Sequence, residues 1–308
     1  MDVLGVGVRF ALYLDLMVMF GLAAFGLLSL RAAERAAVLP LRLAIVASGL
    51  LGAALSALGL AATAASMAGV PLSAIDRTSM VLLLTGTTAG AAWSIRMAAL
   101  ALVVLLSALA SRRPGPGLSA AAAAGGVAVA TLAWTGHGAM DEGAVGWLHL
   151  GADIAHLLAA SVWFGALVGL SMLVMRRSDK VDAAHLTLSQ RALDGFSTTG
   201  TVVVGVIVVT GLVNSWLLVG PNGLSMLSTS LYGRLLVAKV LMFVVMVGLA
   251  SLNRFRLTPA LGRALAGAGA VEAISALRRS LAVETACAVV VLAIVSWLGT
   301  LEPIASAM

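Results

Sequence analysis

Two histidines and an aspartate lie within an otherwise apolar stretch, GWLHLGADIAHLLAASVWFGALVGL, which runs from Gly146 to Leu170. On an α-helix, at about 100° per residue, His149, Asp153 and His156 fall within about 60° of one another and form one polar stripe. Ionisable groups inside an apolar span are costly and usually mark a path for ions or protons. The stripe is therefore the first candidate for chemistry in this chain.

The spacing of the stripe predicts two binding stations rather than one. Seven helical residues rise about 10 Å, whereas a metal–nitrogen bond is only about 2 Å long, so His149 and His156 cannot bind one ion from a straight helix. His149 and Asp153 can share an ion or a hydrogen bond, and so can Asp153 and His156, because each pair lies one helical turn apart. We predict one station at the outer mouth and another about two turns deeper.

His137 lies in the connection WTGHGAMDEGAVGW, just before the stretch that carries the stripe. Such a short connection keeps His137 near His149, and the two side chains, together with Met140, could form the outer station. Imidazole and thioether groups suit copper, whereas hard cations prefer more carboxylates. We therefore predict a metal site from the residues His137, His149, Asp153 and His156. The alternative interpretation is that these histidines cap helix ends and hydrogen-bond to the backbone.

Composition predicts an all-α, polytopic transmembrane helical bundle. The chain has 308 residues, of which 61% are hydrophobic and 10% are charged, and its mean hydropathy is +1.08. A soluble domain would carry roughly a quarter of charged residues. Eight apolar runs are long enough to span a bilayer, namely about 8–30, 43–65, 90–110, 118–136, 151–175, 198–219, 234–252 and 281–300. With no glycine-rich phosphate loop or large polar domain, we expect neither an enzyme nor an ATP-driven pump.

Basic residues gather in alternate connections between these spans. Of the 19 lysines and arginines, 14 lie there: Arg31, Arg35, Arg42, Arg112, Arg113, Arg176, Arg177, Lys180, Arg191, Arg254, Arg256, Arg263, Arg278 and Arg279. Positively charged connections stay in the cytoplasm. We therefore expect both termini to lie outside the cytoplasm, and the mouth of the polar stripe with them.

The two halves of the chain show the same order of weak matches. Gly90 precedes Arg96 by six residues, as Gly233 precedes Lys239. Four helices return the chain to its starting side, so a duplication would give a parallel four-plus-four repeat. We predict two four-helix repeats, 1–136 and 137–308. The segments 76–88 and 222–232 would correspond as short outer surface helices or shallow re-entrant turns.

The residues 137–303 resemble the copper resistance protein D (CopD) family of inner-membrane proteins. The matching pieces are HLGADIAHLLAASVWFGAL, GFSTTGTVVVGVIVVTGLVNSW, YGRLLVAKVLMFVVMVGLASLNRFRLTPAL and LRRSLAVETACAVVVLAIVSWLGTLEP. The resemblance implies eight transmembrane helices in the bacterial inner membrane. It also implies movement of copper ions from the periplasm, beside a periplasmic copper-binding CopC-like partner.

The resemblance further implies which residues matter. The family's histidine-bearing fifth helix corresponds to His149 and His156, its Asn-Arg pair to Asn253 and Arg254, and its acid in the eighth helix to Glu284. The sequence has no Met-rich or His-rich outer segment for capturing copper unaided. That departure favours dependence on a partner protein.

Two alternatives to copper transport remain open from the sequence. The first is a membrane b-type haem protein, in which histidines of facing helices bind the iron. The sequence holds no histidine after His185, so one such pair at most is available. The second is a non-transporting factor that delivers copper to a cuproenzyme at the outer face, for which the same residues would serve.

Overall fold

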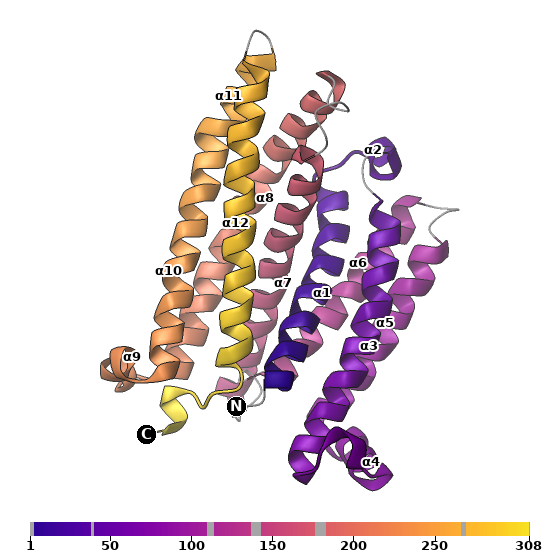
Figure 1. Ribbon diagram of the computed structural model, residues 1–308, viewed down its shortest axis with the longest axis vertical. Coiled ribbons are helices and arrows are strands. Elements are labelled where there is room, and N and C mark those ends of the chain that lie inside the picture. The colour runs from indigo at the N-terminus through magenta and orange to yellow at the C-terminus, as the bar shows by residue number, and fades with distance from the viewer. Residues whose placement is uncertain are drawn as a thin grey trace.

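The structure, a computed structural model, describes residues 3–37, 40–109, 114–136, 143–175, 183–265 and 269–307. His137, Met140, Asp141 and Glu142 lie outside the described residues. The described chain forms helices throughout (Figure 1). In chain order the long helices are α1 (Val3–Leu28), α3 (Leu41–Ala68), α5 (Thr88–Leu109), α6 (Pro114–Ala130), α7 (Gly143–Val174), α8 (Ala183–Val219), α10 (Leu231–Leu252) and α12 (Ala270–Leu298).

The short elements connect these helices or extend them. They are α2 (Ala32–Ala37), η1 (Leu72–Ala74), α4 (Arg77–Gly86), η2 (Thr131–Thr135), η5 (Gly223–Ser225), α9 (Met226–Thr229), the π-helical turn η6 (Asn253–Leu257), α11 (Thr258–Leu265) and η7 (Ile304–Ala307). η2 continues α6, and η6 and α11 continue α10. The expected short helices between spans are present in the described chain, as α4 and α9.

Eight of the described helices are long and apolar enough to cross a membrane, which confirms the predicted bundle. Several of them begin well before the apolar runs that predicted them. α8, for example, begins at Ala183, although its first three turns include Gln190, Arg191 and Asp194. The sequence indicated only the apolar part of each helix, because hydropathy marks the hydrocarbon and not the helical hydrogen bonding that continues beyond it.

Both chain ends lie at the same end of the bundle, which also holds α4 and α9 (Figure 1). α2 and α11 lie at the opposite end. At the end with the termini, the side chain of Asp76 accepts a hydrogen bond from the backbone N–H of Ser79 over 3.0 Å and so caps α4. This bond keeps the pKa of the Asp76 carboxyl below its ordinary value.

α1 and α7 form the centre of the bundle, with 67% and 72% of their apolar segments buried against 11% for the segment that contains α10. The two helices touch through glycines. A Cβ atom on Gly21 would lie 2.7 Å from the Cα atom of Gly165, and one on Gly169 would overlap the ring of Phe25. Small residues at such crossings let two backbones approach closely inside a membrane. α7, which carries the polar stripe, is therefore held in the core by α1.

Candidate metal site

The polar stripe lies on α7 at the end of the bundle that holds the termini. His149 is buried, with 2% of its surface exposed, and Asp153 and His156 are half-buried. The structure thus places three of the four predicted site residues on one central helix. The fourth, His137, lies outside the described residues, so the pairing of His137 with His149 stays a prediction.

Asp153 faces α8 and a set of positive charges. The side-chain amide of Asn214 on α8 donates a long hydrogen bond of 3.4 Å to Asp153 Oδ1. Lys239 of α10 and Arg9 of α1 lie close enough for their charges to act on the Asp153 carboxylate, as does His149. Asp153 therefore balances cations from two other helices instead of standing alone in the membrane.

His156 also faces α8, one helical turn deeper. Its Nδ1 atom lies 3.0 Å from the hydroxyl oxygen of Thr210. That hydroxyl oxygen is also 2.6 Å from the carbonyl oxygen of Val206, a distance at which the hydroxyl must donate its only proton to the carbonyl. Nδ1–H of His156 is then the donor to Thr210, and Nε2 carries the free lone pair. This is the tautomer that binds a metal through Nε2.

A cavity of about 350 Å³ adjoins His156 between α1, α7, α8, α10 and α12. Two methionines line it, Met17 of α1 and Met246 of α10, and both are buried. Lys239 and Trp163 also line it, and most of the remaining wall is apolar. The lining of this cavity therefore includes one imidazole and two thioethers, the ligand types that copper accepts readily.

Within the described ranges, no group of three His, Cys, Asp or Glu side chains is arranged to hold a metal ion. The stripe on its own is consequently an incomplete ligand set. The described cavity beside His156 also presents the thioethers of Met17 and Met246 and the hydroxyl of Ser215.

A second cavity, of about 300 Å³, lies on the other side of Trp163, towards the basic end of the bundle. Its wall includes Glu284, Asn253 and Asp194. Glu284 is 1% exposed and accepts two hydrogen bonds, from the indole N–H of Trp163 (3.1 Å) and from the amide of Asn253 (2.9 Å). The Oδ1 atom of Asn253 is buried and has no hydrogen-bond partner. Polar groups therefore continue through the half of the bundle that lies towards α2 and α11.

Sequence reasoning missed several residues of this site. Thr210, Met246 and Trp163 carried no signal, because threonine, methionine and tryptophan are common in membrane helices. Lys239 was noted only for its spacing from Gly233, yet its charge acts on Asp153 and its side chain lines the cavity. Asn214 carries a polar amide within an apolar run, and this could have marked it as a site residue. The resemblance marked Glu284 without indicating its partners, which are Trp163 and Asn253 in the buried core.

Comparisons with known proteins match this chain to one group of related membrane proteins. Residues 1–147 match the family model "Copper resistance protein D-like, N-terminal domain", and residues 190–298 match "Copper resistance protein D". The chain is 46% identical to copper resistance protein D of Pseudomonas syringae pv. tomato, over 98% of this chain and 97% of that protein.

Two further relatives match shorter parts. The inner membrane protein YebZ of Escherichia coli is 32% identical over 56% of this chain and 55% of its own length. The copper transport protein CutJ of Bacillus subtilis is 32% identical over 39% of this chain and 21% of its own length. No solved structure matches the chain significantly.

Proposed function

Because the chain belongs to the copper resistance protein D (CopD) family of membrane copper-handling proteins, we propose that it moves copper ions from the periplasm across the bacterial inner membrane. Proteins of this family are copper resistance and transport proteins, not enzymes. Copper would enter beside His149, bind next at His156, and leave through the cavity around Glu284.

The observation that carries this proposal is the cavity lined by His156, Met17 and Met246. Nδ1–H of His156 is engaged by Thr210, so Nε2 is the nitrogen available to a metal. One imidazole and two thioethers form a soft ligand set, which suits copper better than magnesium or calcium. A site of this kind in the core of a membrane bundle fits a transported ion.

Lys239 lines the same cavity and would repel a cation if its charge were unbalanced. Asp153 supplies the balance, because the two charges interact within the buried bundle. Asp153 would therefore act twice: it would orient His149 or the incoming ion at the outer station, and it would neutralise Lys239 beside the deeper one.

The inner cavity supports transport over delivery at the outer face. Delivery needs only an outer site, whereas transport needs polar groups on both sides of a barrier. Trp163 lines both cavities and lies between His156 and Glu284 along the bundle. Its ring also packs edge-on against Phe243, with the ring centroids 5.7 Å apart. We propose that these two rings form the barrier and that copper passes it when the rings move.

The distribution of basic residues supports one orientation of the bundle in the membrane. The end of the bundle with α2 and α11 carries most of the arginines, which favours a cytoplasmic position for that end. Both termini and the His149 mouth would then face the periplasm. Because the sequence has no Met-rich or His-rich outer segment, we propose that a CopC-like periplasmic copper-binding protein loads the mouth.

The test is copper accumulation in cells that express the full chain, its His156→Ala variant or no copy. We expect the wild type to raise cytoplasmic copper, and His156→Ala to return it to the level of cells without the protein.

His185→Ala is the matched control, since it removes a histidine outside the stripe. Equal accumulation by the wild type and His156→Ala, at equal amounts of protein in the membrane, would refute the proposal. A gain in periplasmic cuproenzyme activity without cytoplasmic copper would instead favour delivery.

We further propose that the two halves, 1–136 and 137–308, arose as parallel four-helix repeats. Two matching helix starts support this. Thr87 accepts a hydrogen bond from Gly90 N–H, and Ser230 accepts one from Gly233 N–H, each over 3.0 Å. Both glycines pack against the backbone of the preceding short helix, where a Cβ atom would overlap it. An experimental structure in which α5 and α10 do not superpose, when each half is aligned on the other, would contradict the duplication.

A further inference from the structure

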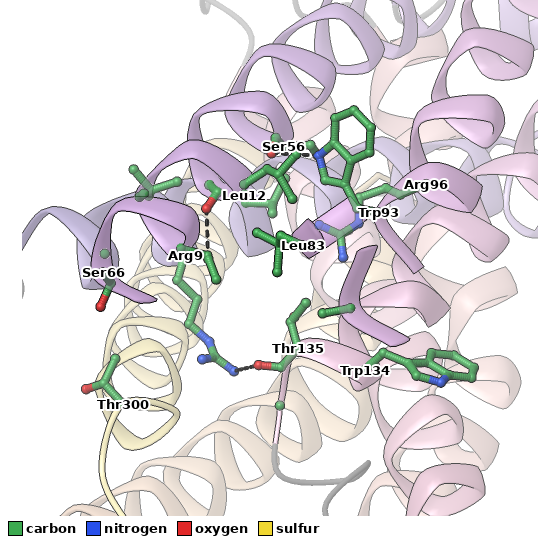
Figure 2. Close-up of a pocket in the computed structure, with 18 of the residues that line it drawn as sticks. Arg9, Leu12, Ser56, Ser66, Leu83, Trp93, Arg96, Trp134, Thr135 and Thr300 are labelled. Atoms are coloured by element: carbon green, nitrogen blue, oxygen red, sulfur yellow. Dashed lines mark hydrogen bonds between the residues drawn. The ribbon is translucent and has the colours of Figure 1, made fainter. Parts of the chain in front are cut away.

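A third cavity, of about 470 Å³, lies in the N-terminal half, at the end of the bundle that holds both termini (Figure 2). α1, α3, α4, α5 and η2 form most of its wall. Among the described residues that line it, Arg9 and Arg96 are the cationic side chains and none is Asp or Glu. Figure 2 shows both guanidinium groups directed into the space that the labelled side chains enclose.

Of the two charges, that of Arg96 is the less compensated. It is 3% exposed, and its printed hydrogen bonds go to the hydroxyl (2.8 Å) and the carbonyl (3.3 Å) of Thr131. Both acceptors are neutral, and Thr131 already donates its hydroxyl proton to Ala128. Among the described residues no carboxylate pairs with Arg96. A buried guanidinium without an anion is unfavourable, so the cavity is built to receive one.

Arg9 stands on the other side of the space. Its guanidinium donates to the carbonyls of Gly299 (2.9 Å) and Thr135 (3.1 Å), which are neutral partners as well. Its Nε–H is buried and has no hydrogen-bond partner. Asp153 of the polar stripe interacts electrostatically with Arg9 and balances part of the Arg9 charge. The described lining residues therefore give the cavity a net positive charge, contributed chiefly by Arg96.

The rest of the wall shows what kind of anion fits. Leu12, Leu83, Trp93 and Trp134 make it largely apolar, and the indole N–H of Trp93 is already used by the carbonyl of Ser56 (2.9 Å). A small hydrated ion would leave most of this surface uncovered. An anion with an attached apolar or glycerol-like body would fill it.

The cavity also borders the lipid. α3 forms one side of it, and its outward leucines are exposed on the bundle surface: Leu43, Leu50, Leu51 and Leu58. At the rim, Thr63, Ser66 and Met67 of α3 are exposed too. A lipid molecule of the surrounding leaflet can therefore reach the cavity without crossing the protein.

We propose that this cavity binds the phosphate group of an anionic phospholipid, with Arg96 as the principal phosphate contact and Arg9 as the second. Guanidinium groups match phosphate oxygens in geometry and charge, and tryptophans suit the headgroup level of a bilayer. The bound lipid would stabilise the packing of α1, α5 and η2 at the end of the bundle where copper would enter beside His149.

The experiment measures lipid binding by the purified full-length protein in detergent, by native mass spectrometry with added phosphatidylglycerol or phosphatidylcholine. We expect phosphatidylglycerol to bind more tightly, and Arg96→Gln to weaken it by about tenfold, as loss of a charged hydrogen bond predicts. Arg42→Gln is the matched control, because Arg42 lies on α3 but outside the cavity. It should bind as the wild type does.

Three results would overturn the proposal: equal binding of both lipids by the wild type, equal loss in Arg96→Gln and Arg42→Gln, or displacement of phosphatidylglycerol by millimolar inorganic phosphate. The last would identify a site for free phosphate. If Arg96→Gln does not fold, Arg96→Lys tests the same point, since it keeps the charge and should retain the preference for phosphatidylglycerol. The comparison of phosphatidylglycerol with phosphatidylcholine binding by the wild type shows by itself whether the site prefers an anionic lipid.

Discussion

Trp163 and Glu284 lie 121 residues apart in the chain and are joined by a buried hydrogen bond of 3.1 Å, in which the indole N–H donates to Oε1. The bond ties α7 to α12 between the two cavities of the C-terminal half. In the same core, Asn253, the first residue of a π-helical turn, donates to the other oxygen of Glu284. Turns of this type occur often at functional sites. One carboxylate thus holds three helices together next to the proposed barrier.

We predict that Trp163→Phe destabilises the protein by about 1–3 kcal/mol, because it removes the donor and leaves a buried carboxylate oxygen unsatisfied. Thermal unfolding in detergent measures the change. Trp216→Phe is the control: Trp216 lies on α8 and is 64% exposed, so its replacement should change stability by no more than about 0.5 kcal/mol. Equal effects of the two substitutions would show that the bond to Glu284 contributes nothing.

The contact of α1 with α7 gives a second prediction. Gly165→Ala places a Cβ atom within the backbone of Gly21, so we expect it to push the helices apart and cost about 1–3 kcal/mol or more. Gly151→Ala lies on the same helix with no atom within 4 Å of the added Cβ. It should be neutral or slightly stabilising, because alanine favours a helix. If both variants unfold at the wild-type temperature, the close crossing is not required for stability.

The sequence predicted the membrane class, the number of spans and the polar face of α7, because these depend on local composition and helical period. It could not predict which helix the stripe faces. That Asp153 meets Asn214 and His156 meets Thr210 on α8 is set by the rotation of two packed helices. Nothing local to His156 indicates that rotation.

Glu284 illustrates the same limit. The resemblance marked this residue, but nothing near it in the sequence indicated a partner. The structure pairs it with Trp163 and Asn253, which the packing of α7, α10 and α12 brings together. The cavities around Trp163 also depend on that packing and leave no pattern in the sequence.

A third prediction concerns the thioethers. Met17→Leu and Met246→Leu keep the apolar volume of the cavity wall but remove a soft ligand, so each should weaken copper binding by about tenfold or more. Met19→Leu is a matched control, because Met19 lies on the same helix as Met17 and is buried but outside the cavity lining. Titration of the purified protein with copper measures the difference. Equal affinity in all three variants would exclude the methionines as ligands.

A fourth prediction tests the topology. A reporter fused after Gly146 should lie in the periplasm, and one fused after Met175 in the cytoplasm, because the basic connections stay inside. Alkaline phosphatase is active only outside and green fluorescent protein only inside, so the two reporters should give opposite patterns at the two positions. The same pattern at both would contradict the orientation and the proposed periplasmic mouth.

The last prediction separates the two stations of the stripe. His149 and His156 share one face of α7 but lie about 10 Å apart along it, so one ion cannot bind both. His149→Ala should weaken capture at low external copper while leaving transport at saturating copper largely intact. His156→Ala should stop transport even at saturating copper, because His156 supplies the only imidazole among the described residues that line the cavity with Met17 and Met246. Copper uptake measured over a range of concentrations distinguishes the two patterns.

Binding at equilibrium gives the second readout of the two-station model. Each substitution should remove one copper ion from the bound total and leave the other in place, as two separate sites require. Asp153→Asn should weaken both stations, since Asp153 lies between them and balances Lys239. If either histidine variant lost all bound copper, the two residues would belong to one site, and α7 would have to bend to bring them together. If neither variant changed binding or uptake, the histidines would be helix-packing groups, with His156 serving only to hold Thr210.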